Sequence, residues 1–267
     1  IDHGGSDLAA PTLSMYAQKG GHLLRLLGEK DVNALHPDDV QRYINLRIAE
    51  GAHRETVRKE LVTLRRTLET ARERGRLRSS PSGLIPKFRV RYVPRSRYLS
   101  EPEFRRLLFA LPSRRRLWVM LAVFTGARLS EVEGLRWAEH VDPACRWLLL
   151  PGTKTARARR RVGIAPALAR AFRAEPSRDG FVVEHWGNVR RDLAAACRRA
   201  GIAPVTPNDL RRTFASWLKQ RGVDSMVVAR LLGHTTSRMV ELVYGQLNDA
   251  AFARAIAVIP PTSIGKP

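Results

Sequence analysis

The sequence is poor in cysteine and in long apolar runs. Its 267 residues include only two cysteines, Cys145 and Cys197, and neither has a partner at the spacing of a metal site. A disulfide framework is therefore not expected, and a reducing compartment suits the chain better. The longest apolar stretch, residues 117–124, is shorter than the roughly 18 residues that a membrane span needs. A signal peptide is not evident either, so we expect no association with a membrane.

Acidic residues are also scarce. The chain has 25 Asp and Glu against 47 Lys and Arg, which gives a net charge of +22. Such a surplus repels itself in a compact protein and usually faces a polyanion. Ribosomal association or simple solubility would explain the charge too, but a nucleic acid is the favoured partner. Carboxylates at metal-like spacing, which a two-metal nuclease or transposase needs, are missing, so no metal is expected.

Composition and periodicity divide the chain into parts without an internal repeat, and the length suffices for two cores. We predict a mainly α protein with a small antiparallel β-sheet, an α+β fold. The predicted parts are a disordered leader or expression remnant (1–10), a helical DNA-binding domain (11–80), a basic interdomain linker (81–98), a catalytic domain (99–258) and a C-terminal tail (259–267).

In the first domain, an apolar face predicts a helix that begins near Pro37 and turns Val40, Tyr43, Ile44 and Ile48 toward the core. A second helix is expected to stop at Gly75.

The linker is interrupted by prolines and carries five positive charges and no negative one. A flexible tether would explain it, but a strap lying across DNA phosphates is favoured. The basic residues assigned to DNA are Lys87, Arg89, Arg91, Arg95 and Arg97.

The second domain opens with a capping box, in which Ser100 begins a helix and Glu103 closes the box. A buried helix follows and ends at residues 125–126. Two short strands, 147–150 and 161–164, are expected to pair across a polar turn.

Arg128 lies between two predicted helices. Gly126 closes the first helix, and Ser130 with Glu133 can form a capping box at the start of the second. An arginine held in such a corner can make a bidentate contact with a phosphate. A salt bridge to Glu131 that ties the corner together is an equal alternative.

A second candidate phosphate site opens another predicted helix. Thr206 is its expected N-cap, with Pro207 at the first helical position and Asp209 as partner in a capping box. Asn208 and Arg211 are three residues apart near this N-terminus, where the helix dipole favours an anion. A solvated arginine is the alternative.

Two further candidates lie toward the C-terminus. Asp224 caps a helix that Gly233 ends, and His234 follows at the turn, where it can donate a hydrogen bond to an oxyanion. A structural histidine is the common alternative. Tyr244 comes ten residues later, and by its spacing from Val240 it could also be a core residue.

The order and spacing of these residues resemble the tyrosine recombinase (phage integrase) family over nearly the whole chain. The segment TGARLSE is similar to the box that carries the family's first catalytic arginine, here Arg128. The segment NDLRRTFAS resembles the HxxR box and gives Arg211, LLGH gives His234, and VYG gives the nucleophile Tyr244. Lys154, in the turn between the two predicted strands, matches the family's catalytic lysine.

One position departs from the family pattern. Asn208 stands where the HxxR box has histidine. An amide can hydrogen-bond a phosphate oxygen, but it cannot take up a proton near neutral pH. General-base help at this position is therefore in doubt.

The resemblance implies a site-specific DNA recombinase that uses no metal, cofactor or ATP. Tyr244 would form a 3′-phosphotyrosine bond while Lys154 protonates the departing 5′-oxygen. Four protomers would act on two double-stranded DNA sites and exchange a C-terminal helix, residues 249–258. The setting would be the bacterial cytoplasm, near the nucleoid, or a phage infection. Alternatives are a non-catalytic DNA-binding regulator and a type IB topoisomerase-like enzyme.

Overall fold

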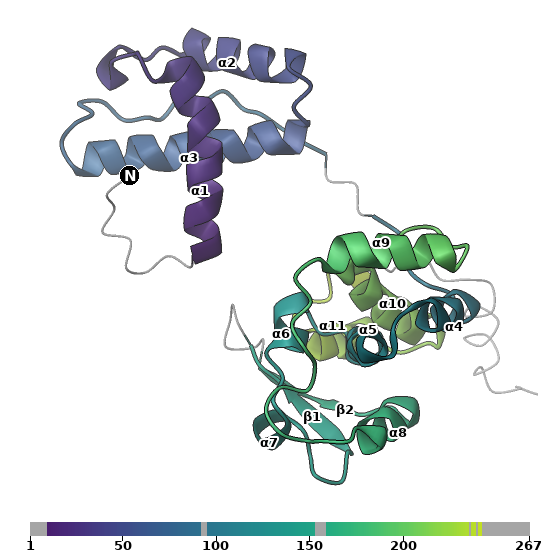
Figure 1. The fold of residues 1–267 in the computed structure, drawn as a ribbon. Helices are drawn as coiled ribbons and strands as arrows, with labels where there is room; N and C mark the ends of the chain where they lie inside the picture. Colours follow the sequence, from purple (N-terminus) through teal and green to yellow (C-terminus); the bar gives the residue numbers. More distant parts are fainter. Residues whose placement is uncertain (1–9, 92–94, 153–158, 235, 239, 242–267) are drawn as a thin grey trace, which may run out of the picture. The chain divides into compact units, whose positions relative to one another are not determined.

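The computed structural model describes residues 10–91, 95–152, 159–234, 236–238 and 240–241, and the chain divides into two compact units, 1–93 and 94–267 (Figure 1). Each unit is described by itself. Across these described stretches, none of the helices has the length and apolar character needed to span a bilayer.

Unit 1 is helical. Its elements are α1 (Ala10–Leu27), the 3-10 helix η1 (Val32–Ala34), α2 (Pro37–Ala49) and α3 (Arg54–Glu73). The predicted start at Pro37 is confirmed, and His36 precedes it as N-cap. Gly75 follows the end of α3 with a φ of +68°, a backbone conformation that costs glycine little. The predicted stop is therefore confirmed.

The core of unit 1 contains a charged pair that the apolar pattern did not predict. Val40, Tyr43 and Ile44 are buried as expected, but Ile48 is 39% exposed, so its assignment to the core was wrong. Arg47 is buried in its place because both Arg47 and the hydroxyl of Tyr43 donate hydrogen bonds to the buried carboxylate of Glu60.

The first part of the predicted linker lies against this core. Leu84, Ile85 and Phe88 pack on the buried residues of unit 1. The guanidinium of Arg54 stacks 4.5 Å from the ring centre of Phe88 and also donates to the carbonyl of Arg89. This segment is thereby attached to α3.

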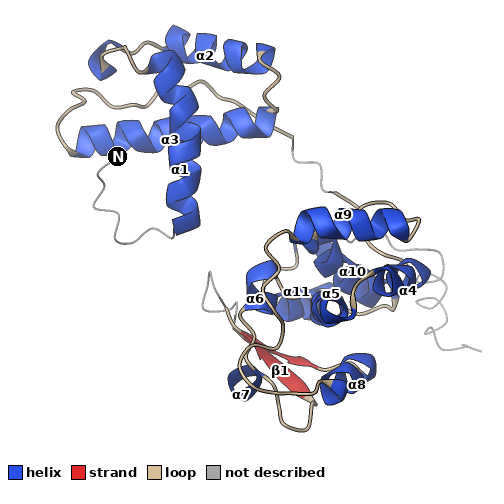
Figure 2. Ribbon diagram, in the orientation of Figure 1, coloured by secondary structure: helices blue, strands red, loops and turns tan. Residues whose placement is uncertain are grey.

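Unit 2 combines helices with a two-stranded antiparallel sheet (Figure 2). Its elements are α4 (Glu101–Ala110), α5 (Ser113–Thr125), α6 (Leu129–Glu133), α7 (Trp137–His140), β1 (Trp147–Leu150), β2 (Arg160–Gly163), α8 (Pro166–Ala174), α9 (Val189–Arg199), α10 (Pro207–Gln220) and α11 (Ser225–Leu232). The predicted fold class is confirmed. The second strand begins one residue earlier than expected, and Ser100 and Glu103 form the predicted capping box.

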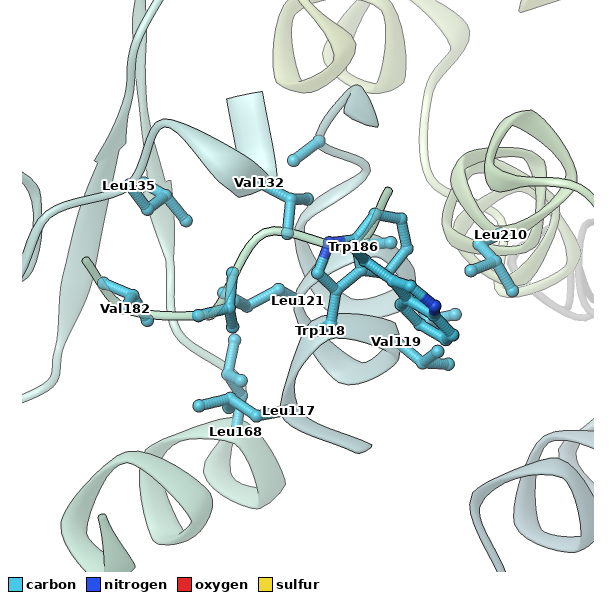
Figure 3. Packing of buried hydrophobic residues seen from close by; sticks show 14 of the residues in the cluster. Leu117, Trp118, Val119, Leu121, Val132, Leu135, Leu168, Val182, Trp186 and Leu210 are labelled. Atoms are coloured by element: carbon cyan, nitrogen blue, oxygen red, sulfur yellow. The ribbon is translucent and has the colours of Figure 1, made fainter. Parts of the chain in front are cut away.

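Helix α5 forms the centre of unit 2. Trp118 and Leu121 are fully buried, and the ring of Trp118 meets that of Trp186 edge-on at 5.4 Å (Figure 3). Helix α10 packs along α5. In the sheet, Leu150 pairs with Arg160, and alternate residues of each strand turn inward. Burial of this apolar surface fixes the C-terminal end of α5 beside α10.

Candidate active site

Arg128 lies in the corner between α5 and α6, as predicted. Helix α5 ends at Gly126 (φ +64°), and Arg128 is the residue that precedes α6. Its backbone N–H and its guanidinium both donate to the carboxylate of Glu131, at 2.8 and 2.7 Å. The acid that caps α6 is thus Glu131, and the expected Ser130–Glu133 box was wrong because Ser130 already lies inside the helix. The Arg128 side chain is still 32% exposed.

Arg211 is buried where three elements meet. The predicted cap of α10 by Thr206 and Asp209 is confirmed and places Arg211 in the helix's second turn. The Arg211 guanidinium donates to the carbonyls of Gly126 and Leu232, both at 2.6 Å. Its burial excludes the alternative of a solvated arginine. It ties the ends of α5 and α11 to α10.

Asn208 lies one turn before Arg211 in α10. Its side chain is exposed. The amide is therefore open to a ligand that approaches the N-terminal end of this helix.

His234 follows the end of α11. Asp224 caps this helix and Gly233 ends it in the left-handed conformation, as predicted. His234 Nε2 lies 3.1 Å from Nη2 of Arg211. Because an arginine can only donate, Nε2 accepts this bond and the ring proton is assigned to Nδ1. Nδ1 is buried and has no hydrogen-bond partner among the residues that the structure describes.

The charge state of His234 follows from its surroundings. Burial, and then the positive charges of Arg211, Arg128 and Arg160, lower the pKa of His234 to about 4. The ring is therefore neutral near pH 7 and keeps one N–H to donate.

The predicted site lacked one buried pair, Glu131 with Arg160. Arg160 is the first residue of β2, and its guanidinium donates to both carboxylate oxygens of Glu131, at 3.2 and 3.0 Å. Its Nε donates to the carbonyl of Leu231. Burial opposes ionisation of Glu131, but the hydrogen bonds from Arg160 and Arg128 outweigh it and hold the pKa of the carboxyl below its ordinary value. A strand beginning at residue 160 would have placed Arg160 on the inward side with Val162, without identifying Glu131 as its partner.

The cluster carries a net positive charge. Arg128, Arg160 and Arg211 contribute three positive charges and Glu131 one negative charge, while His234 is neutral, which leaves a sum of +2. Donors fixed in this way suit an anion such as a phosphodiester, whose charge grows when it is attacked.

Two predicted site residues cannot be placed against this cluster. Lys154 and Tyr244 lie outside the described residues, as does the predicted exchanged helix, residues 249–258. Over the described ranges there is no group of three or more His, Cys, Asp or Glu that could hold a metal ion.

The basic residues of the predicted linker differ in their surroundings. Lys87, Arg89 and Arg91 are exposed. Arg95 lies 3.4 Å from Asp209 and donates to the carbonyl of Pro204. Arg97 is paired with Glu103 at 2.9 Å and donates to the carbonyl of Ala203. Arg95 and Arg97 thus attach the first residues of unit 2 to α4 and to the loop and helix start at residues 203–209 of the same unit.

Comparisons with known proteins agree on one family. The sequence profile of the phage integrase family matches residues 97–251. The chain is 38% identical over 65 residues to prophage integrase IntR of Escherichia coli, covering 24% of this chain and 16% of that protein. It is 32% identical over 160 residues to tyrosine recombinase XerA of Pyrococcus furiosus, covering 54% of each.

A third relative is tyrosine recombinase XerD of Mycobacterium tuberculosis, which is 36% identical over 154 residues, covering 50% of this chain and 49% of that protein. The chain thus spans about half the length of XerA and XerD, and less of IntR.

Solved structures share the fold. A lambda integrase (75–356) dimer bound to a core site has a TM-score of 0.72 at 21% identity, with 88% of this chain and 92% of that chain covered. The Tn1549 transposon integrase with transposon right end DNA has a TM-score of 0.71 at 16% identity, with 96% of each chain covered.

Proposed function

Because this chain belongs to the phage integrase family, we propose that it is a site-specific DNA recombinase that cuts and rejoins DNA through a covalent bond to Tyr244. The observation that supports this most directly is the convergence of Arg128, Arg211 and His234 from three separate segments on one positively charged cluster, in which Glu131 lies near both arginines. Family proteins that resemble this chain carry the name tyrosine recombinase.

In this proposal the cluster binds the scissile phosphate. Arg128 and Arg211 contact its non-bridging oxygens, and His234 and the amide of Asn208 add hydrogen bonds. The net charge of +2 matches the two negative charges of the non-bridging oxygens in the transition state, one present in the phosphodiester and one that develops during attack. One such preorganised donor is worth roughly 10²–10³ in rate, or about 3–4 kcal/mol.

Tyr244 supplies the nucleophile and Lys154 the proton. The phenolic oxygen of Tyr244 loses its proton to solvent and bonds to phosphorus, the bond from phosphorus to the 5′-oxygen breaks, and the Lys154 ammonium protonates that oxygen. A 5′-hydroxyl from a second DNA reverses the step. Because the phosphotyrosine conserves the energy of the broken bond, we propose that exchange needs neither ATP nor a metal.

The rest of the chain would hold the DNA and the other protomers. We propose that residues 11–80 bind the core site, that the basic segment 81–98 lies along phosphates, and that 99–258 form the catalytic domain. A tetramer that exchanges residues 249–258 would act on two DNA sites, since a related fold, lambda integrase, has been solved as a tetramer bound to a Holliday junction. The cytoplasm, where bacterial and archaeal cells keep their DNA, is the proposed location.

Deletion of the residues after Asn248 tests this assembly. We expect the truncated chain to lose tetramers on DNA while it still binds a single site. Equal loss of both would count against exchange of the C-terminal helix.

Covalent capture tests the chemistry. The chain is incubated with a library of nicked duplexes of randomised sequence, and complexes that survive detergent are collected and their DNA sequenced. We expect adducts with wild type and with the control Tyr98→Phe, and none with Tyr244→Phe. Tyr98 is a suitable control because its hydroxyl accepts a bond from Gln220 and contacts none of the clustered residues that the structure describes.

The captured sequences separate the alternatives. Enrichment of one motif supports a recombinase, whereas adducts without sequence preference would indicate a topoisomerase-like enzyme. Binding without any adduct would indicate a non-catalytic DNA-binding protein and overturn the proposal.

A further inference from the structure

Arg160 differs from the other two arginines around Glu131. Its side chain is 7% exposed, against 32% for Arg128. Its two terminal nitrogens are engaged by the carboxylate of Glu131 and its Nε by the carbonyl of Leu231. Arg160 therefore cannot reach a phosphate without leaving Glu131, so its contribution to the site must be indirect.

Glu131 is the group on which Arg160 acts. The Glu131 side chain has no exposed surface, and a carboxylate so placed must be paired because its desolvation is costly. The other cations within reach are Arg128, at 2.7 Å, and Arg211, at 3.9 Å. Without Arg160, the Glu131 charge would be met by Arg128, already 2.7 Å away, and by the more distant Arg211, so it would offset their positive charge beside the phosphate site.

We infer that Arg160 is a positioning residue that neutralises Glu131, so that the positive charge of Arg128 and Arg211 acts on the phosphate and is not spent on this carboxylate. This inference rests on the proposed function of the cluster. Arg160 also joins β2 to the last turn of α11, three residues before His234. Arg160 thus holds the segment that leads to His234 in place, and it also balances the charge of the Glu131 carboxylate.

The chain offers a matched control in the next residue of the same strand. Arg161 is exposed, and its guanidinium stacks 4.1 Å from the ring centre of Trp147. Arg160→Met and Arg161→Met therefore remove the same charge from adjacent positions that face opposite sides of β2. They differ in whether Glu131 loses its partner.

The rate of covalent-complex formation on a duplex recovered by capture is measured for wild type, Arg160→Met, Arg161→Met and the double variant Glu131→Gln/Arg160→Met. We expect Arg160→Met to slow it about 100-fold, because the uncompensated Glu131 weakens the preorganised arginines, each worth roughly 10²–10³ in rate. Arg161→Met should stay within about twofold of wild type, since exposed substitutions away from the site have small effects. The double variant should recover to within about tenfold of wild type, because no buried charge is left unpaired.

The recovery separates neutralisation from a purely structural role. If Arg160 only held the strand in place, adding Glu131→Gln would restore nothing, and failure of the double variant to recover while its circular dichroism matches that of wild type would overturn the inference. If Arg160→Met does not fold, the rates of the double variant and of Arg160→Lys, which keeps the charge, are compared with that of wild type. If neither of these variants reaches a rate within about tenfold of wild type, the inference is also overturned.

A second readout does not depend on strand cleavage. The pKa of His234, followed by NMR in the free protein, should rise in Arg160→Met, fall back in the double variant and stay unchanged in Arg161→Met. A pKa that is the same in all four proteins would overturn the inference. If wild type forms no adduct with any duplex, the proposed function fails, and this titration still decides whether Arg160 neutralises Glu131.

Discussion

Nη2 of Arg211 lies 3.1 Å from Nε2 of His234, although both side chains can carry a positive charge. The contact is stable because the histidine is neutral and offers a lone pair. The same guanidinium is held by the carbonyls of Gly126 and Leu232, so it cannot retreat from the ring. The geometry therefore ties the protonation state of His234 to the position of a proposed phosphate ligand.

His234 should titrate far below an ordinary histidine. In the free protein we expect a pKa of about 4, against 6.5 for an unperturbed ring, because of burial and the neighbouring arginines. Bound DNA should raise it, since a phosphate adds negative charge beside the ring. NMR of the imidazole signals, assigned with His234→Gln, measures both values. A pKa of 6.5 in the free protein would contradict the assigned neutral state.

The same shift predicts how stability depends on pH. The folded pKa of His234 lies below the unfolded one, so between the two values the unfolded chain binds more protons. The free energy of unfolding should therefore rise with pH across that window, by at most about 1.4 kcal/mol per pH unit from this group, and level off above it. Urea denaturation of wild type and His234→Gln over this range measures the effect as the difference in slope.

Arg211 and Arg128 should differ in their importance for stability. A lysine at 211 cannot donate to the carbonyls of Gly126 and Leu232 at once, and it leaves a buried acceptor unpaired, which costs about 1–3 kcal/mol. Arg128→Lys replaces a partly exposed ion pair and should cost less than about 1 kcal/mol. Both variants should cleave at least about 100-fold more slowly. Equal destabilisation in urea would show that Arg211 does not hold the three segments together.

Asn208 provides a test of the departure from the family pattern. Asn208→His should cleave DNA as fast as wild type or faster, because the imidazole can donate the same bond and also take up a proton. Since the side chain is exposed, neither this variant nor Asn208→Ala should change the unfolding midpoint in urea. A large loss of cleavage in Asn208→His would mean that the site is built around the amide.

The helix ends were predictable from the sequence because they depend on near neighbours. Ser100, Thr206 and Asp224 each bond to a backbone N–H two or three residues away, so a short window contains the whole signal. The glycines that end helices, such as Gly126 and Gly233, are likewise recognised from their immediate neighbours. These local signals were enough to place Arg128, Asn208, Arg211 and His234 on their elements.

The buried charged pairs were not predictable because their partners are far away in the chain. Arg160 pairs with Glu131, 29 residues before it, and Arg47 pairs with Glu60 on the next helix. A period of 3.6 residues allowed either Arg47 or Ile48 to face the core, and the buried carboxylate decided for Arg47. The wrong cap of α6 has the same origin, since Glu131 caps this helix while it pairs with Arg160.

Gly126 should be intolerant of a side chain. A Cβ at this position would lie 2.5 Å from Cδ1 of Phe214 and 2.8 Å from Cδ2 of Leu232, and its φ is +64°. Gly126→Ala should therefore destabilise the protein by about 1–3 kcal/mol through crowding, in addition to backbone strain. Gly180 has the same φ with no atom within 4 Å of its Cβ position, so Gly180→Ala measures the strain alone. Equal unfolding midpoints for the two variants would rule out the crowding.

Glu60 should be the most sensitive charged residue of unit 1. Its fully buried carboxylate accepts two bonds from Arg47 and one from the hydroxyl of Tyr43, so Glu60→Gln removes the buried counter-charge of this guanidinium and leaves it paired with the partly exposed Glu50. Breaking such a pair on one side costs about 3–5 kcal/mol. Tyr43→Phe removes a single hydrogen bond and should cost about 1–3 kcal/mol.

Glu50→Gln is the matched control, because Glu50 also pairs with Arg47 but is 36% exposed. Pairs accessible to water contribute about 0–1 kcal/mol, so this variant should unfold close to wild type. The comparison uses urea unfolding of the full chain, with Trp fluorescence reporting on unit 2, which contains all five tryptophans, and circular dichroism on both units. A loss confined to the circular dichroism signal would place the damage in unit 1. If Glu60→Gln unfolded no earlier than Glu50→Gln, the buried pair would not be what holds α2 against α3.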